Sequence, residues 1–360
     1  MFRIYLILAL LPLIAQVPSD PPVDSAARGA AIEQLVSRLE AGYVVPAGAQ
    51  AAIARVREAQ RSGMYDQLGS AKAFAAQLTA DLQAASRDKH LAVFVDPEPT
   101  AVQKTKGSPK PMPPPRERFN YGFYKIERLL GNVGYLEIRS FANLDEARAT
   151  AASYLDALAN FDAIVLDLRQ NGGGNTPMAA FVASYFFGST PVHFTDMYWR
   201  DQRRTVEVWT TKKVPGRRAT SQDLFILVGP STFSAAEDFS YAMQQLKRAT
   251  LVGETTGGGA HMGRGLQRIS PLFTAFIPTG QSVNPITKTN WENTGVTPDV
   301  SVPAPRALVE AHLAALRRLL EREEDATWKA TLQRALETVT AQSKGGERVG
   351  CSPDRLHYFR

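Results

Sequence analysis

The stretch Phe225–Phe239, FILVGPSTFSAAEDF, decides how the centre of this chain is interpreted. An apolar run, Leu224–Val228, ends at a Gly-Pro pair, and a short polar turn leads to Ser234 and a helical pattern. This order predicts a buried strand, a tight turn and a helix with Ser234 at its N-cap. Open α/β sheets bind their ligands at this carboxyl edge of the strands.

A serine at this position has two chemical assets. Its hydroxyl stands at the strand edge, and the free N–H of Ala235 and the positive end of the helix dipole can stabilise an anion beside it. An acyl-transfer nucleophile with half of an oxyanion hole needs these features. An ordinary serine N-cap is the alternative, and it is far commoner among helices.

Length and composition are those of a globular protein. The 360 residues suffice for about two domains of roughly 150 residues each. Apolar residues make up 44% and charged residues 21%, and the net charge of +6 is mild for this length. A single cysteine, Cys351, excludes an internal disulfide and most cysteine-based metal sites.

The N-terminus predicts export. Arg3 forms a short positive region, Ile4–Ala15 is apolar, and Pro18 begins a polar stretch. The apolar run is too short to span a bilayer, so residues 1–17 are interpreted as a signal peptide. We expect a periplasmic or extracellular protein with no integral membrane contact after cleavage, and a membrane-anchored one if the segment is not cleaved.

Four further segments follow from patterning. Apolar residues at helical spacing, such as Leu35 and Leu39, favour three helices before residue 90. A stretch rich in Pro and Lys then cannot bury a core. The predicted segments are a small helical N-terminal domain (24–95), a linker (96–117), a core domain (118–305), and C-terminal helices with a tail (306–360).

The core domain alternates strands with helices, which favours βαβ units and a largely parallel sheet. Ala163–Leu168, AIVLDL, is a continuous apolar run typical of a central strand. Paired strands are expected within Pro191–Thr210, with a tip near Lys212–Arg218. The other expected elements are strands at Val133–Ile138, Leu224–Val228 and Thr250–Gly253, and helices at Asp145–Ala159, Pro177–Phe187, Ala307–Leu320 and Trp328–Val339.

Two glycine-rich turns follow strands of this domain: Arg169–Asn175 (RQNGGGN) and Thr255–His261 (TTGGGAH). Their spacing fits neither common phosphate-binding motif, and neither contains a lysine. One interpretation is that the glycines leave the backbone uncovered, so that its N–H groups can bind an oxyanion. A tight turn that needs positive φ is the other.

A serine nucleophile needs a neighbour that takes its proton. The chain has five histidines, and His90 and His261 are the candidates. Sequence distance does not choose between them, because members of a catalytic triad come from different elements. The other three are expected to be structural or exposed: His193, His312 and His357.

Four blocks in order resemble one family of proteins. AIVLDLRQNGGG, STFSAAEDF, LVGETTGGG and ENTGVTPDV, within about Val133–Val302, resemble peptidase family S41. That family contains the carboxyl-terminal processing proteases, tricorn protease and the modules of interphotoreceptor retinoid-binding protein. The segment Ala27–Val95, ending in DKHLAVFVD, resembles the N-terminal domain of the retinoid-binding-protein-like branch.

The resemblance implies a crotonase-like α/β spiral for the core, as the catalytic domain, with Ser234 as nucleophile. The processing branch has a lysine base where this chain has Gly259. The tricorn-like branch uses a histidine and a glutamate, which match His90 and Glu292. The implied oxyanion hole is the N–H of Ala235 with one from Gly172 or Gly173. Glu237 is expected to complement the helix dipole.

We therefore expect an exported serine endopeptidase that cuts peptides or unfolded proteins and needs no metal or cofactor. The sequence leaves no room for a PDZ domain, and no nucleic-acid recognition module accompanies its basic residues. Two alternatives stay open: a module of the same fold that binds apolar ligands such as retinoids or lipids, and an esterase.

Overall fold

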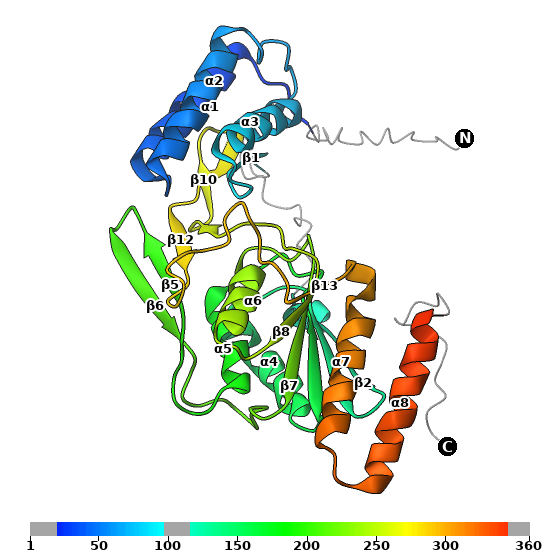
Figure 1. The fold of residues 1–360 in the computed structure, drawn as a ribbon. Helices are drawn as coiled ribbons and strands as arrows, with labels where there is room; N and C mark the ends of the chain where they lie inside the picture. Colours follow the sequence, from blue (N-terminus) through cyan, green and yellow to red (C-terminus); the bar gives the residue numbers. More distant parts are fainter. Residues whose placement is uncertain (1–19, 97–115, 345–360) are drawn as a thin grey trace, which may run out of the picture.

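The computed structural model describes residues 20–96 and 116–344. The predicted signal peptide, nearly all of the predicted linker and the tail after residue 344 lie outside these ranges. Figure 1 shows a helical N-terminal part above a larger part built on a sheet. Over the described ranges, no helix has both the length and the hydropathy that a membrane span requires.

A six-stranded sheet forms the centre of the larger part, and its strands run parallel except β2 at one edge. This confirms the prediction of a mixed α/β fold with a largely parallel sheet. The spatial order is β13 (Val300–Ser301), β8 (Thr250–Gly253), β7 (Asp223–Val228), β4 (Ala163–Asp167), β3 (Val133–Ile138) and β2 (Phe123–Leu129).

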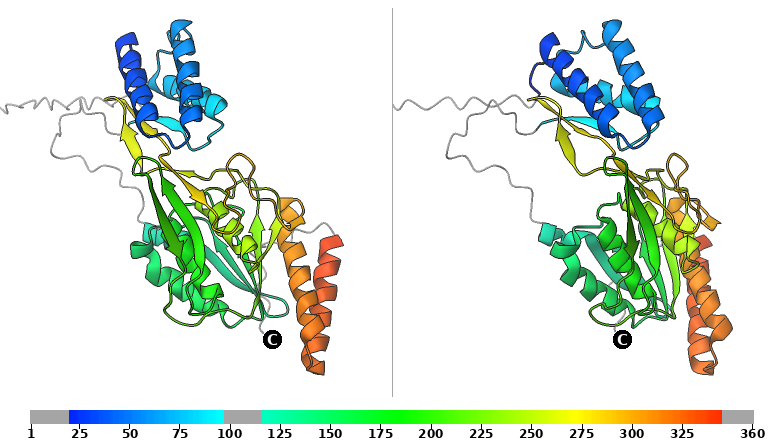
Figure 2. Two further views of the ribbon diagram at one scale, coloured as in Figure 1. Left: turned by 60° about the vertical axis from the view of Figure 1, so that its left-hand side comes forward. Right: turned by 90° about the vertical axis from the view of Figure 1, so that its left-hand side faces the viewer.

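Helices cover both faces of this sheet, as Figures 1 and 2 show. In β4, Ile164 and Leu166 pack on one side while Ala163 and Val165 pack on the other, so these four positions are apolar on both faces of the sheet. The first side carries α4 (Leu144–Leu158), α5 (Thr176–Ala183) and α6 (Ala235–Gln245). The second carries α7 (Ala307–Arg322) and α8 (Ala326–Lys344).

The predicted hairpin exists, but its predicted tip is wrong. Strands β5 (His193–Trp199) and β6 (Arg204–Trp209) turn at residues 200–203, where Arg203 has φ of 47°. The basic segment after β6 instead returns along the core, where the guanidinium of Arg217 pairs with Asp156 and that of Arg218 donates to backbone carbonyls. These two arginines therefore bond to other parts of the same chain.

The N-terminal part holds the three expected helices: α1 (Ser25–Gly42), α2 (Pro46–Arg61) and α3 (Ala71–Ser86). It also holds a sheet that the patterns did not predict. Strand β1 (Ala92–Val95) pairs with β11 (Phe273–Phe276), which pairs with β10 (Leu266–Arg268). Residues well beyond Ser234 in sequence thus complete the N-terminal core, in which the ring of Phe273 contacts that of Phe74.

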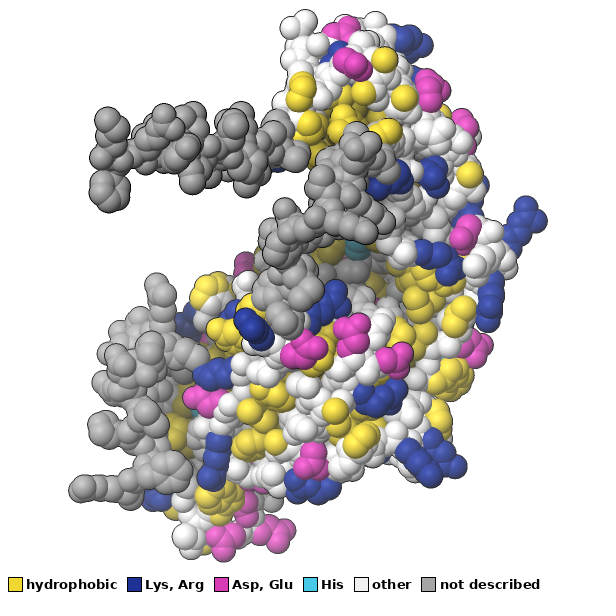
Figure 3. Space-filling model, turned by 180° about the vertical axis from the view of Figure 1, so that it is seen from behind, with side chains coloured by type: hydrophobic (Ala, Val, Ile, Leu, Met, Phe, Trp, Pro, Cys, Tyr) yellow, Lys and Arg dark blue, Asp and Glu magenta, His cyan; other side chains and the backbone are white. Residues whose placement is uncertain are grey.

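A third sheet joins the two parts. Strand β12 (Gly280–Val283) pairs with β5 on one side and with β9 (His261–Met262) on the other. It follows directly on β11 along the chain, so it connects the N-terminal core to the hairpin. Figure 3 shows a hollow between the two parts, with acidic and basic side chains interspersed over that face.

Phe273→Ala tests whether this late strand supports the N-terminal core. The side chain is fully buried, so the change should lower the free energy of unfolding by about 3–5 kcal/mol in urea titrations. Leu266→Ala, in the neighbouring strand but 56% exposed, should change it by no more than about 0.5 kcal/mol. Equal effects of the two changes would contradict the assignment.

Candidate active site

Ser234 occupies a strained turn between β7 and α6. Its φ and ψ are 56° and −123°, a conformation that is costly for a residue with a side chain. The backbone N–H of Ser234 donates to the carboxylate of Glu237 at 2.8 Å. Strain of this kind collects at functional sites, and here it turns the serine out of the strand at the first turn of the helix.

The carboxylate of Glu237 is fully buried and holds two turns together. Besides Ser234, it accepts hydrogen bonds from the hydroxyl of Thr256 and the N–H groups of Gly258 and Gly259. Burial raises the pKa of Glu237, and these bonds act in the opposite direction by stabilising the ionised form. The residue does more than complement the helix dipole, because it fixes the second glycine turn against the serine.

The first glycine turn lies against the serine turn, and its N–H groups differ in whether they are occupied. The N–H of Gly173 donates to Asn171 at 2.8 Å and is already occupied. In the described chain, no acceptor contacts the N–H of Gly172 or of Ala235. Of the two predicted glycines, Gly172 therefore keeps a free donor. Gly173 has a packing role, because a Cβ there would lie 2.8 Å from the Cβ of Ser234.

His90 lies against the serine turn. Its ring packs on that of Phe233, the residue before Ser234, with centroids 4.5 Å apart. A Cβ on Gly259 would lie 2.7 Å from Cε1 of His90, so the imidazole uses the space beside this glycine. Burial lowers the pKa of His90 to about 4, and the ring is neutral at pH 7. No hydrogen bond joins His90 to Ser234 in the described residues.

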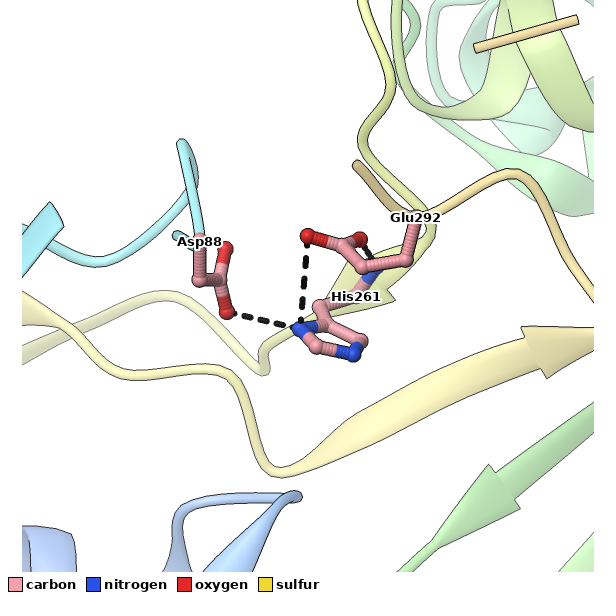
Figure 4. A group of neighbouring side chains, drawn as sticks. All are labelled: Asp88, His261 and Glu292. Atoms are coloured by element: carbon pink, nitrogen blue, oxygen red, sulfur yellow. Dashed lines mark hydrogen bonds and ion pairs between the residues drawn. The ribbon is translucent and has the colours of Figure 1, made fainter. Parts of the chain in front are cut away.

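Asp88 contacts both candidate histidines, and Figure 4 shows its contact with His261. It is fully buried, and its Oδ2 lies 2.7 Å from Nδ1 of His261 and accepts from the hydroxyl of Tyr43 at 2.8 Å. Its Oδ1 accepts from the N–H of His90 at 2.8 Å and lies 3.9 Å from Nδ1 of that ring. Within the described ranges, Nδ1 of His90 has no hydrogen-bond partner.

Glu292 contacts His261 and makes no described contact with His90. Its Oε2 accepts from the N–H groups of Ala260 and His261, and its Oε1 lies 3.7 Å from Nδ1 of His261. Asp88 and Glu292 raise the pKa of His261 against the opposing effect of burial. In Figure 4 the other ring nitrogen of His261, Nε2, points away from both carboxylates.

A cavity of about 240 Å³ opens beside the serine. Its wall combines backbone at Gly174 and Gly259 with the side chains of Trp199 and Met262, and both Ser234 and His261 line it. Next to it, the ammonium group of Lys89 donates to the carbonyl of Gly257 at 2.6 Å. This bond ties the N-terminal part to the second glycine turn.

Two clusters of the described residues have the composition of a metal site. Asp88, His261 and Glu292 form one, and His193, Asp196 and Glu207 on the hairpin form the other. In each cluster a histidine nitrogen already lies at hydrogen-bond distance from an aspartate, at 2.7 and 2.8 Å. In the first cluster, Oε1 of Glu292 lies 3.7 Å from Nδ1 of His261 and has no hydrogen-bond partner among the described residues.

Sequence reasoning brought together Ser234, His90, Ala235 and Gly172, but it missed three members of the site. Asp88 stands two residues before His90, and the motifs predict no role for it. Tyr43 lies in no motif of the sequence. Glu237 was assigned to the helix dipole. Spacing gave a signal for Asp88 alone, since a carboxylate at this offset can accept the N–H of residue 90.

Two family models match the chain. Peptidase family S41 matches residues 132–302, and the N-terminal domain of peptidase S41 in eukaryotic IRBP matches residues 25–121. The carboxyl-terminal-processing peptidase 2, chloroplastic, of Arabidopsis thaliana is 29% identical over 178 residues, which cover 48% of this chain and 32% of that protein. The carboxyl-terminal-processing protease of Synechocystis is 34% identical over 128 residues, 35% of this chain and 28% of that protein.

The matched region spans less than a third of the length of each of these curated relatives. Among solved structures, a lipoprotein from Streptococcus agalactiae has a TM-score of 0.55 at 16% identity, over 81% of this chain and 97% of that one. This likeness concerns the fold alone. It extends over both parts of the molecule, since neither part by itself makes up that share of the chain.

The buried position of His90 predicts a loss of stability in acid. Its pKa is about 4 in the folded chain and about 6.5 when unfolded. As the pH falls, the unfolded chain therefore takes up a proton before the folded chain does. The free energy of unfolding should decrease by up to about 3 kcal/mol between pH 6.5 and pH 4. The free energy of unfolding, measured by urea titration, should fall less between pH 7 and pH 4.5 for His90→Gln than for the unchanged chain. Equal losses would contradict the burial of a neutral imidazole.

Proposed function

Because the chain belongs to peptidase family S41, we propose that it is a serine peptidase that cleaves peptide bonds through an acyl-enzyme on Ser234. One observation carries the proposal. The strained Ser234 turn lies beside two backbone N–H groups, on Ala235 and Gly172, for which the described residues supply no acceptor, while the His90 ring packs against the same turn. A nucleophile, an oxyanion hole and a base are the parts that acyl transfer needs.

In the proposed reaction, Oγ of Ser234 attacks the carbonyl carbon while His90 takes its proton. The oxyanion of the tetrahedral intermediate accepts hydrogen bonds from Ala235 and Gly172. His90 then gives the proton to the leaving amine, which leaves an ester on Ser234. Water attacks this ester with His90 again as base, and the acid product and the serine hydroxyl are restored.

The carboxylate behind the base is assigned here to Asp88. It accepts the N–H of His90 and lies 3.9 Å from Nδ1, so a small rotation of the ring would close the bond. Glu292, which the resemblance implied for this role, is proposed to act through His261 instead. His261 is the second candidate base, because Asp88 orients its Nδ1 and it lines the cavity of Ser234.

The remaining features of the proposal follow from the sequence. We take peptides or unfolded proteins as the substrate class and export through residues 1–17 as the route to the compartment. The core is taken as the crotonase-like spiral of the family. The carboxyl-terminal processing named for the curated relatives is not carried over as a cleavage preference, because the match spans less than a third of those proteins.

Ser234→Ala tests the nucleophile. A fluorophosphonate probe should add covalently to the unchanged protein, and mass spectrometry should locate the adduct on Ser234. The variant should not label, and peptide cleavage should fall more than about 10⁴-fold. Ser231→Ala, a serine in the same turn, should label and cleave normally. A folded, unlabelled protein that cleaves no peptide would overturn the proposal.

Gly259→Ala tests the placement of His90. The new Cβ would lie 2.2 Å from Cζ of Phe233 and 2.7 Å from Cε1 of His90. Displacing the base by about 1 Å should lower kcat about 100-fold. Gly188→Ala is the matched control, because no heavy atom lies within 4 Å of its Cβ. If Gly259→Ala keeps full activity, His90 is not the base.

A further inference from the structure

A second cavity, of about 760 Å³, adjoins the cavity of Ser234. Gly174 and Asn175 line both, so only this short segment separates the two. This segment follows Gly172 and Gly173 in sequence, next to the proposed oxyanion hole. None of the catalytic steps uses the second cavity, although its volume would hold at least one large side chain.

Aromatic rings form much of the wall of this second cavity. Phe119 and Tyr121 come from the turn before β2, Tyr124 from β2 itself, and Phe141 from the loop after β3. Phe119 is 63% exposed and Tyr124 is 56% exposed, values that are high for rings of this size. Grouped exposed aromatics mark places where a ligand or a partner is bound.

The charges in this cavity are already paired. The guanidinium of Arg139 stacks on Tyr124, 3.3 Å from the ring centroid, and donates to Glu137 at 2.6 Å. Arg116 lies 3.8 Å from the carboxylate of Glu146. Because both arginines are already paired with glutamates, a carboxylate ligand would gain little binding energy from them. A flat aromatic or large apolar group gains more, because it can pack on rings and guanidinium planes alike.

The segment between the two cavities is hydrogen-bonded to Phe141 and presents no side chain at Gly174. Phe141 N–H donates to Gly173 at 2.9 Å, and Asn175 N–H donates to Phe141 at 2.7 Å. Gly174 has φ of 131°, and a Cβ on it would lie 2.1 Å from the carbonyl oxygen of Phe141. An extended peptide held at Ser234 can therefore pass over this backbone into the second cavity.

We propose that the second cavity is a substrate subsite that takes an aromatic or large apolar side chain of the peptide, with Phe119 and Tyr124 as its selecting contacts. The inference rests on the proposed peptidase activity, from which the identity of the ligand as a peptide follows. The second cavity shares Gly174 and Asn175 with the Ser234 site, and both of its arginines are paired with glutamates.

The first test measures selectivity. Peptides that differ in one residue at a time, Phe against Ala, are compared by kcat/KM. At one position Phe should be preferred, and Tyr124→Ala should lower that preference at least tenfold, with Tyr124→Phe restoring it. Trp209→Ala, a ring that is 47% exposed on β6 outside both cavities, should leave the preference unchanged.

The second test separates the subsite from the chemistry. Fluorescence anisotropy with Ser234→Ala measures binding of the preferred Phe peptide without turnover, and adding Tyr124→Ala should weaken binding at least tenfold. An active enzyme with no aromatic preference, or with one that Tyr124→Ala leaves intact, would overturn the subsite and leave the peptidase standing. A chain that neither labels nor cleaves overturns the peptidase, and binding that ignores Tyr124 then overturns the subsite as well.

Discussion

The buried carboxylate of Glu237 is the constraint on which the site depends. Its two oxygens accept hydrogen bonds from Ser234, Thr256, Gly258 and Gly259, which fix the serine turn and the second glycine turn in one arrangement. A carboxylate with four donors can stay in the protein interior, whereas one that lost them would carry an unpaired buried charge. The strain at Ser234 can persist because this network determines the position of its backbone.

The second turn, once fixed, lets two parts of the molecule share one site. The missing side chain at Gly259 leaves space for His90, which comes from the end of the N-terminal part. Lys89 bonds the carbonyl of Gly257, and Asp88 pairs with His261 of the core. In return, β11, which belongs to the later part of the chain, packs its buried residues into the N-terminal core. Both residues that precede the proposed base, Asp88 and Lys89, are thus bonded to the core.

The sequence predicts the core well because its signals are local. The run at residues 163–168 is apolar on both faces, and Ser234 follows a strand directly, so neither prediction needs a distant partner. The pairing of β1 with β11 escaped prediction because short strands carry little pattern and their partner is far along the chain. The contacts of Glu292 and Asp88 could not be predicted either, because they depend on how the two parts of the molecule pack together. That packing determines which histidine each carboxylate contacts.

The central claim is that Ser234, Ala235, Gly172 and His90 act together, and a crystal structure of the phosphonylated enzyme tests it most directly. The account predicts a phosphoryl oxygen about 2.7–3.1 Å from the N–H nitrogens of Ala235 and Gly172. It also predicts Nε2 of His90 within hydrogen-bond reach of the adduct, with Asp88 behind the ring. An adduct whose oxygen meets neither N–H, or one faced by His261 in place of His90, would contradict it.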